Sequence, residues 1–441
     1  MSDIPAGGPP PAKQTVPASA PQTAPVSRLG ALEVDMRFLG MVGALAIIWI
    51  VFDFLADHTF LTPRNLWNLS VQTASIAVMS TGMVLVIVMR HIDLSVGSIL
   101  GVTGMVMAVF QASYLMPAFG FNHPAVWMLT LVVGIALGAS IGALQGFIIA
   151  YLGVPAFIVT LGGLLVWRGA AWAVAEGKTI PLTDDHFKLL GGGADGSIGA
   201  GWSWMVCTLA ILAIVFATVR ARQQRKRFRF PLKPVWAEFV TAGFASLAVI
   251  AATLVMNAYT LPAALARRYA EAHGIEVPAD GLFISFGYAV PVLVALAVGI
   301  VMTFITTRTR FGRYVFAIGG NPEAAELAGI NTRRITVQVF ALMGGLAAIG
   351  AAISTARLNS ATNAQGTLDE LYVIAAAVIG GTSLSGGAGT VAGAMLGALV
   401  MQSLQSGMVL MRVDTPYQNI VVGMVLVFAV FIDTVYRKRF K

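Results

Sequence analysis

Residues 71–115 read VQTASIAVMSTGMVLVIVM, RHIDLS and VGSILGVTGMVMAVFQASYL in succession. Two unbroken apolar runs, 71–89 and 96–115, thus flank a short polar interruption that contains Arg90, His91 and Asp93. A bilayer-spanning helix needs about 20 predominantly apolar residues, whereas a strand of a membrane β-barrel shows about ten residues of alternating hydrophobicity. The stretch therefore predicts two transmembrane helices joined by a polar turn, and it argues against a barrel.

The rest of the 441-residue chain repeats this pattern. Hydrophobic residues make up 57% of the sequence and charged residues 11%, against about 45–50% and about 25% in soluble domains. We therefore exclude a soluble globular fold and predict an all-α, polytopic transmembrane bundle of about 10–12 spans, one of them short or broken. The apolar runs are 38–55, 71–89, 96–115, 126–150, 157–174, 205–219, 236–256, 289–307, 335–353, 371–381, 390–410 and 421–435.

The positive charges predict the orientation of the bundle. Most of the 28 Lys and Arg residues fall in alternate loops, including the basic run 220–233, and Lys- and Arg-rich short loops stay on the cytoplasmic side. Both termini should therefore be cytoplasmic. We expect residues 1–30, rich in Pro, Ala and Ser, to form a disordered cytoplasmic tail without a secretory signal, and residues 31–441 to form the membrane domain. We expect the basic run to contact lipid headgroups rather than nucleic acid.

The chain offers little material for catalysis or metal binding. Its five His are scattered, its only Cys, Cys207, lies in an apolar run, and no paired carboxylates stand at catalytic spacing. Gly177 and Lys178 resemble the end of a phosphate-binding loop, but Trp172 occupies the position of the glycine that such a loop requires. We therefore predict no enzyme activity, no metal site and no cofactor bound by this chain.

Acidic side chains are scarce within the apolar runs. Asp53, Glu238 and Asp433 lie near the ends of runs, and no other Glu occupies one. Carriers driven by protons or sodium place ionisable groups near the bilayer midplane. Ion coupling therefore has weak support, and an uncharged polar solute suits the path better than an ionised one.

Two polar, glycine-containing interruptions mark a candidate translocation path. The first lies at 90–98, and the second, 380–387, follows a run that covers only about 16 Å at 1.5 Å per residue. Backbone without helical hydrogen bonds at membrane depth must line a cavity or be buried in protein. The alternative for the first interruption is a turn in which Asp93 or Ser95 caps the next helix. The residues that we assign to the path are Asp93, Ser95, Ser98, Thr382, Ser383 and Ser385.

Residues 308–334, between two runs, carry the signals of a short helix outside the membrane. Asn321 can cap a helix that begins at Pro322, Glu323 places negative charge in its first turn, and Gly329 can end it. Small and apolar side chains would line one face and suit a groove on another protein, namely Ala324, Leu327 and Ala328. The alternative is a surface helix packed against its own bundle.

Three segments, 92–98, 319–331 and 369–387, together resemble the permease subunits of bacterial ABC sugar importers of the ribose and xylose class. The resemblance covers about 65–441. Region 196–281, an inserted helix pair with the basic loop, favours the xylose type, because the shorter ribose-type permeases lack it. The Leu-Pro that often ends the coupling loop of such importers is absent here, where Ala341 and Leu342 stand near the expected place.

The resemblance implies a permease of the bacterial inner membrane that moves a monosaccharide, a pentose such as xylose, by alternating access. Its partners would be cytoplasmic ABC ATPase subunits that bind ATP-Mg, a periplasmic sugar-binding protein, a second permease copy in a homodimer, and membrane lipids. The loop 308–334 would contact the ATPase, and the residues that match the coupling segment are Gly319, Gly320, Asn321, Pro322, Glu323, Ala324, Glu326, Leu327, Gly329, Ile330 and Asn331.

Two other functions remain open from the sequence. A self-sufficient, ion-coupled secondary carrier of a small polar solute would need an ion site and would not need the helix at 321–329. A structural or assembly subunit would need no path at all. We also expect the helix pair in 196–281 to pack peripherally, because its spans carry no polar interruption like those at Asp93 or Ser383.

Overall fold

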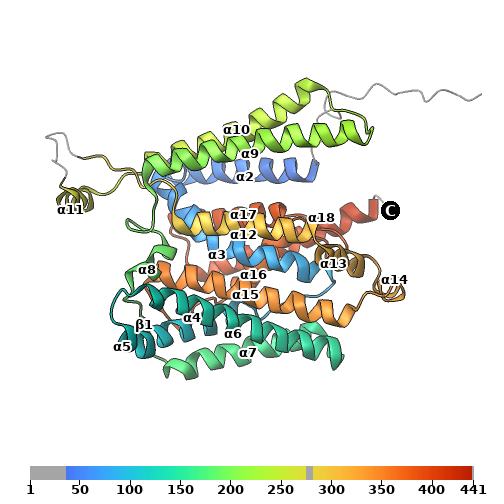
Figure 1. Cartoon of the computed structure of the whole chain (residues 1–441), viewed down its shortest axis with the longest axis horizontal. Helices are drawn as coiled ribbons and strands as arrows, with labels where there is room; N and C mark the ends of the chain where they lie inside the picture. Colours follow the sequence, from blue (N-terminus) through green and yellow to red (C-terminus); the bar gives the residue numbers. More distant parts are fainter. Residues whose placement is uncertain (1–35, 275–281, 440–441) are drawn as a thin grey trace, which may run out of the picture.

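A computed structural model describes residues 36–274 and 282–439, and the tail predicted at 1–30 lies outside this range. The described elements are almost all helices (Figure 1). In chain order they are α2 (Met36–Leu55), α3 (Pro63–Val88), α4 (Val96–Phe110), the π-helix Gln111–Leu115, α5 (Met116–Phe119), α6 (Pro124–Tyr151), α7 (Ala156–Ala175), β1 (Ile180–Pro181), α8 (Asp185–Lys188), the 3₁₀ turn Leu189–Gly191, α9 (Gly199–Arg227), α10 (Val235–Ala258), α11 (Ala263–His273), α12 (Val290–Arg308), α13 (Arg310–Gly320), α14 (Pro322–Leu327), α15 (Thr332–Leu358), β2 (Ser360–Ala361), α16 (Asp369–Ile379), α17 (Val391–Leu410) and α18 (Thr415–Arg439).

The predicted all-α, polytopic fold is confirmed. Ten helices of the described chain are long and apolar enough to span a membrane, with α4, the π-helix and α5 counting as one. The other two predicted runs fall on shorter apolar helices, 371–381 on the 11-residue α16 and 421–435 on α18, whose apolar part is Thr415–Phe431. Which side of the membrane the termini occupy stays a prediction.

Helix α3 lies at the centre of the bundle. In the most apolar 18-residue stretch of α3, 94% of the residues are buried, and the helix packs against α12, α15, α16 and α17. Apolar side chains of α3 occur on every face of the helix, which is the pattern of a helix enclosed by others. The outer helices are exposed in the single chain, and lipid or a partner would cover their apolar faces.

Glycines allow α6 and α15 to pack closely. Gly138, Gly142 and Gly146 recur every four residues on one face of α6, and a Cβ at Gly142 would overlap the carbonyl of Phe340 in α15. In the same way Gly138 faces the backbone of Gly344. Small residues at this spacing let two membrane helices bring their backbones together, which increases van der Waals contact.

The helix pair α9 and α10 lies at one edge of the bundle, at the top of Figure 1. In the most apolar 18-residue stretch of each helix only 11% of the residues are buried, as we expected for a peripheral pair. An aromatic cluster attaches it to the core: the rings of Trp67 and Phe286 lie 5.0 Å apart, and Tyr259 stacks on Phe286 at 4.5 Å. The indole of Trp67 also donates a hydrogen bond to the carbonyl of Gly287.

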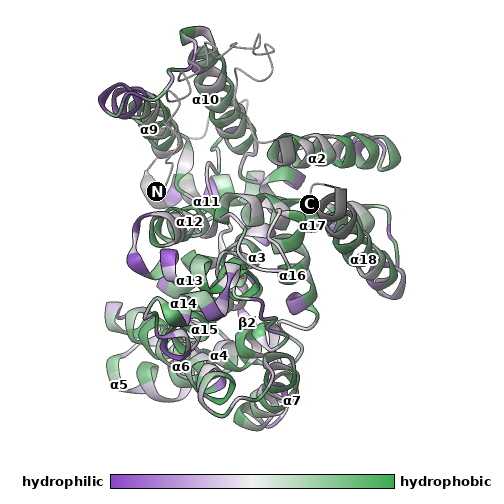
Figure 2. Ribbon diagram, turned by 90° about the vertical axis from the view of Figure 1, so that its right-hand side faces the viewer, coloured by the Kyte–Doolittle hydropathy of each residue, from purple (hydrophilic) through white to green (hydrophobic). Residues whose placement is uncertain are grey.

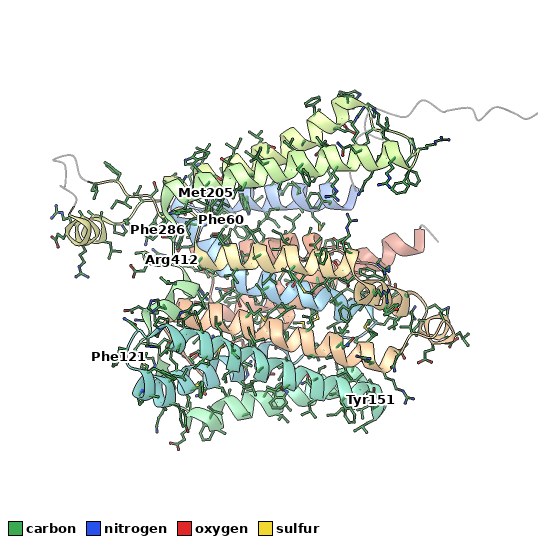
Figure 3. All side chains as sticks on the ribbon, in the orientation of Figure 1. Phe60, Phe121, Tyr151, Met205, Phe286 and Arg412 are labelled. Atoms are coloured by element: carbon green, nitrogen blue, oxygen red, sulfur yellow. The ribbon has the colours of Figure 1, made fainter. Side chains whose placement is uncertain are left out.

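The bundle has two distinct ends, which we call the α14 end and the α8 end. In Figure 1 the α14 end, on the right, carries α13, α14, the basic loop between α9 and α10, and the end of α18. The α8 end carries α5, α8, α11 and the β1–β2 pair. Figure 3 shows Tyr151 at the α14 end of α6 and Phe121 near its other end. Viewed from the α14 end, polar residues gather on α13, α14 and one end of α9, while the spans are apolar (Figure 2).

Candidate functional site

The first polar interruption turns back into the bundle. Helix α3 ends at Val88, and Arg90 adopts a left-handed conformation (φ 65°) that reverses the chain. Ser95 then meets Gln145 of α6, six residues before the end of that helix and therefore about 9 Å inside it. This irregular backbone lies inside the protein, where its polar groups find partners.

Asp93 and Ser95 form a buried polar cluster with Gln145. The Asp93 carboxylate, 1% exposed, accepts hydrogen bonds from the backbone N–H of Ser95 at 2.8 Å and from its hydroxyl at 2.5 Å. The same hydroxyl lies 3.0 Å from Oε1 of Gln145, and Ser98 donates to the carbonyl of Ser95. Ser95 occupies the N-cap position of α4, but its side chain makes no capping hydrogen bond, so the capping alternative is wrong for Ser95.

The second interruption meets the start of the first, where Gly386 lies against Arg90. Gly387 donates from its backbone N–H to the carbonyl of Val88 at 3.0 Å, so the turn packs on the end of α3. Thr382 and Ser383 are fully buried, and the Ser383 hydroxyl is 2.9 Å from that of the exposed Ser385. Within the described residues no hydrogen bond joins the side chain of Thr382 or Ser383 to Asp93 or its partners. The six predicted path residues therefore form two separate groups.

A partly buried charge cluster, which the sequence interpretation missed, lies between α4, α7 and α16. Arg168, near the middle of α7, donates to the carbonyls of Gln365 at 2.6 Å and Gly366 at 3.1 Å. These carbonyls belong to the loop before α16, whose first turn contains Asp369 and the 7%-exposed Glu370. A Cβ at Gly97 of α4 would overlap the Glu370 carboxylate, so glycine is needed there for this loop to approach.

The signal for this cluster was present in the sequence. Glu370 directly precedes the run 371–381 and so lies outside the predicted spans. A run that short cannot cross a bilayer, so the residues at its start must lie at membrane depth. Within the described residues one carboxylate oxygen of Glu370 and the side-chain NH₂ of Gln145 have no hydrogen-bond partner. Buried polar atoms without partners are costly and suggest a functional site.

The loop 308–334 contains two helices rather than one. Helix α13 begins after Thr309, whose hydroxyl accepts a hydrogen bond from the N–H of Gly312. Asn321 then caps α14 by accepting from the N–H of Ala324 at 3.0 Å, and Gly329 follows with φ 82°, as the sequence indicates. We call α13, α14 and the turn to Asn331 the elbow.

The elbow packs on the bundle through α13 and is exposed to solvent at α14. A Cβ at Gly319 would overlap the carbonyl of Val88, so α13 packs directly on the end of α3. Ala325 is buried, whereas Leu327 is 90% exposed and Glu323 and Glu326 lie on the surface. Glu326 also accepts a hydrogen bond from the Thr332 hydroxyl at 2.6 Å. Thus α14 packs on its own bundle through Ala325 but leaves Leu327 uncovered, and its role as a docking helix stays a prediction.

Comparison with known proteins identifies the family. The sequence profile described as "Branched-chain amino acid transport system / permease component" matches residues 65–430. The chain is 34% identical over 410 residues to the xylose transport system permease protein of Escherichia coli K12, covering 93% of this chain and 95% of that protein. It is 30% identical over 398 residues to the ribose import permease protein of the same organism, covering 90% and 94%.

A third relative is the D-allose transport system permease protein of Escherichia coli K12, 26% identical over 394 residues with 89% and 90% coverage. No solved structure matches the chain significantly. These matches confirm the resemblance drawn from the three motifs, and together with the ten apolar helices they identify a multi-pass protein of the inner membrane. The chain therefore belongs to the family described as the permease components of branched-chain amino acid transport systems, and its relatives in this family are ABC sugar permeases.

Proposed function

We propose that the chain is the membrane permease of an ATP-driven importer that translocates a monosaccharide, a pentose such as xylose. The near full-length similarity to a xylose permease and a ribose permease carries the proposal, because both relatives are named for pentoses. Hydrolysis of ATP-Mg takes place on separate cytoplasmic subunits, a periplasmic protein delivers the sugar, and a second copy of the chain completes a homodimer.

The elbow is the contact for the ATPase in this proposal. It projects from the α14 end, where the basic loop between α9 and α10 also lies, so this end faces the cytoplasm by the distribution of Lys and Arg (Figure 1). The exposed Leu327 and the two glutamates offer an apolar knob beside negative charge. A groove with basic residues at its rim would complement both features.

The elbow proposal is tested with Leu327→Asp in the complete complex. The side chain is 90% exposed, so the permease should insert and fold as before, while the amount of ATPase that co-purifies should fall. Leu152→Asp is the matched control, because Leu152 is a 65%-exposed leucine in the α6–α7 connection at the same end. Equal ATPase recovery in both variants would show that the elbow is not the docking site.

The two groups of predicted path residues form inner sections of the path in this proposal. Ser95 belongs to the group that packs on α6, and Ser383 belongs to the group at the end of α3. Hydroxyls exchange hydrogen bonds readily, which suits the passage of an uncharged sugar. Cysteine introduced at either position should react with small polar thiol reagents to an extent that depends on ATP. Inaccessibility in all states would assign both groups to packing alone.

A secondary carrier is the second candidate, favoured by one observation. The half-buried carboxylate of Asp369 and the buried carboxylate of Glu370 could hold a proton or a sodium ion at membrane depth. Reconstitution into vesicles distinguishes the two functions. An importer takes up sugar only with ATPase, ATP and binding protein present, whereas uptake by the chain alone under a proton or sodium gradient would contradict our proposal.

A further inference from the structure

We propose that a polar groove at the α8 end, between α3, α15 and α17, binds the monosaccharide as it enters the bundle. This inference rests on the proposed function, for which it names the outer binding site. Two adjoining cavities of about 360 and 370 Å³ form the groove. They share three lining residues, Asn68 and Gln72 of α3 and Arg357 of α15, so one continuous surface leads from the loops into the bundle.

The lining of the inner cavity consists mainly of groups that form hydrogen bonds. Besides the three shared residues it includes Asp369 of α16 and Gln402 and Gln405 of α17. Amides, a carboxylate and a guanidinium are the side chains that can donate to and accept from sugar hydroxyls. The exposed faces of the outer spans are apolar, so the lining of this groove differs from them in polarity.

These polar side chains are not used to hold the fold together. Within the described residues, the side chains of Asn68, Gln72, Gln402 and Gln405 form no hydrogen bond with another protein group, although Gln402 is only 6% exposed. By contrast Asn65, on the same face of α3, accepts from Ser406 and donates to the carbonyl of Phe60. Amides at membrane depth without protein partners are costly unless water or a ligand satisfies them.

The charge of the groove suits an uncharged ligand. Arg357 and Asp369 attract one another, but among the described contacts they form no ion pair, so each keeps free hydrogen-bonding atoms on the cavity. Together they are neutral, and the other polar groups of the inner cavity carry no charge. A branched-chain amino acid would need an apolar pocket for its side chain, whereas a sugar needs polar contacts around its ring, and the lining supplies the second.

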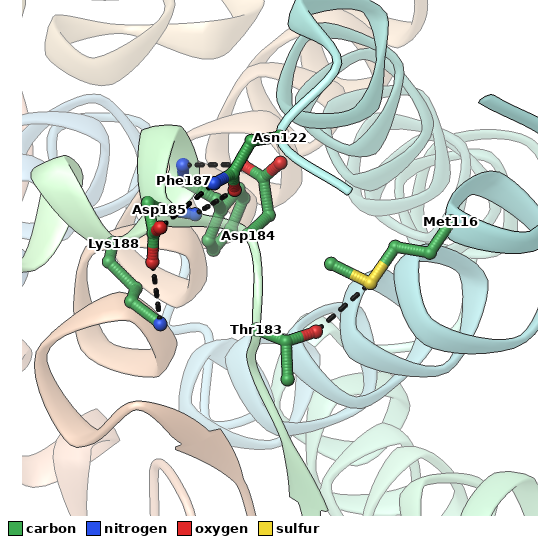
Figure 4. Close-up of polar contacts among 7 residues, drawn as sticks. All are labelled: Met116, Asn122, Thr183, Asp184, Asp185, Phe187 and Lys188. Carbon is green, nitrogen blue, oxygen red and sulfur yellow. Dashed lines mark hydrogen bonds and ion pairs between the residues drawn. The ribbon is translucent and has the colours of Figure 1, made fainter. Parts of the chain in front are cut away.

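The mouth of the groove is built by a fixed loop. Asp185 and Lys188 lie at the outer cavity, joined by an ion pair of 2.9 Å (Figure 4). Asn122 donates to the Asp185 carboxylate at 2.9 Å and accepts from its backbone N–H at 3.0 Å. The hydrogen bonds from Lys188 and Asn122 lower the pKa of the Asp185 carboxyl, so it stays ionised. These contacts hold α8 beside the groove and keep the entrance in place.

The floor of the groove connects to the inner path. Asp369 lines the cavity, and the next residue, Glu370, packs against Gly97 of α4, two residues beyond Ser95. The N-terminus of α16 therefore separates the outer groove from the Asp93 segment. This position explains why α16 is short: the helix begins at membrane depth, where its first turn presents one acid to each side.

Sugar protection of a cysteine tests the site directly. In a Cys207→Ser background, Asn68→Cys in the assembled importer should react with a small polar maleimide, because Asn68 lines both cavities. Millimolar D-xylose or D-ribose should slow the reaction several-fold, and leucine should not. If neither sugar slows it, or if leucine protects as well as they do, the groove is not a monosaccharide site.

Transport by apolar variants gives a second, independent measurement. Gln72→Leu and Gln405→Leu keep the side-chain size but remove the amide, so uptake should fall about tenfold or more. Gln111→Leu is the matched control, because Gln111 is a buried amide in the π-helix, outside the groove. Recovery of the ATPase with each variant reports folding. If both groove variants take up sugar like the wild type, the assignment of the groove as a sugar site is wrong, while the proposed function still stands. If the assembled wild-type complex itself moves no sugar, the proposed function is wrong.

Discussion

The guanidinium of Arg90 donates a hydrogen bond of 2.9 Å from Nε to the carbonyl of Gly319, and its Nη2 donates one of 2.7 Å to the carbonyl of Gly320. This contact joins the start of the Asp93 segment to the last turn of α13. Helix α14 follows directly, so a displacement of the elbow would be passed to Arg90 and then to Asp93, three residues along the chain. Chains of packed side chains and hydrogen bonds can carry coupling between distant sites, and these two hydrogen bonds provide one such connection.

Replacement of Arg90 should therefore uncouple the elbow from the path. Arg90→Asn is the appropriate variant, because asparagine tolerates the left-handed backbone at φ 65° but cannot reach both carbonyls. We expect sugar-stimulated ATP hydrolysis to fall about tenfold while the ATPase still co-purifies. Arg412→Asn is the control, since Arg412 also has a left-handed backbone (φ 57°) but lies at the α8 end (Figure 3). Normal stimulation in the Arg90 variant would exclude this contact as the link.

Gly329 should be required for the direction in which α14 projects. Its φ of 82° costs a β-branched residue more than about 1 kcal/mol, although a side chain there would meet open space. Gly329→Val should therefore lower sugar uptake and ATPase recovery through the backbone alone. Gly153→Val is the control, because Gly153 also has a positive φ (73°) and faces open space but lies in the α6–α7 connection, outside the elbow. Equal losses in the two variants would point to a general effect of backbone strain and not to the direction of α14.

These examples show which features the sequence could predict. The cap at Asn321 and the turn at Gly329 depend on contacts within a few residues, so local patterns were sufficient. Helix α13 was missed because two of the four residues on its buried face are glycines, Gly312 and Gly319, which on their own disfavour a helix. The short run after Glu370 indicates its depth, but the partners of Glu370 and Arg168 depend on how α16 and α7 pack, which no local pattern records. The groove escaped notice for the same reason, since its amides come from separate helices.

The packing of α6 on α15 should be sensitive to a single methyl group. Gly142→Ala places a Cβ against the carbonyl of Phe340, and overpacking of this kind costs about 1–3 kcal/mol. The temperature of unfolding in detergent should fall. In Gly162→Ala, at an α7 position with open space, the temperature should stay the same or rise, because alanine favours a helix over glycine by about 1 kcal/mol. An unchanged temperature in the Gly142 variant would show that the two helices can separate at little cost.

Arg168 should act through the geometry of its guanidinium rather than through charge alone. It donates to the carbonyls of Gln365 and Gly366, and its charge also lies near Asp369 and Glu370. Arg168→Lys keeps the charge but cannot bridge the two carbonyls, and loss of charged donors from such groups costs roughly 2 kcal/mol. We therefore expect Arg168→Lys and Arg168→Gln to lower the temperature of unfolding and the sugar uptake to a similar extent. If the lysine variant matches the wild type and only the glutamine variant loses stability and uptake, Arg168 acts by neutralising the charge of the acids at the start of α16. In that case the position of the loop does not depend on the hydrogen bonds of Arg168.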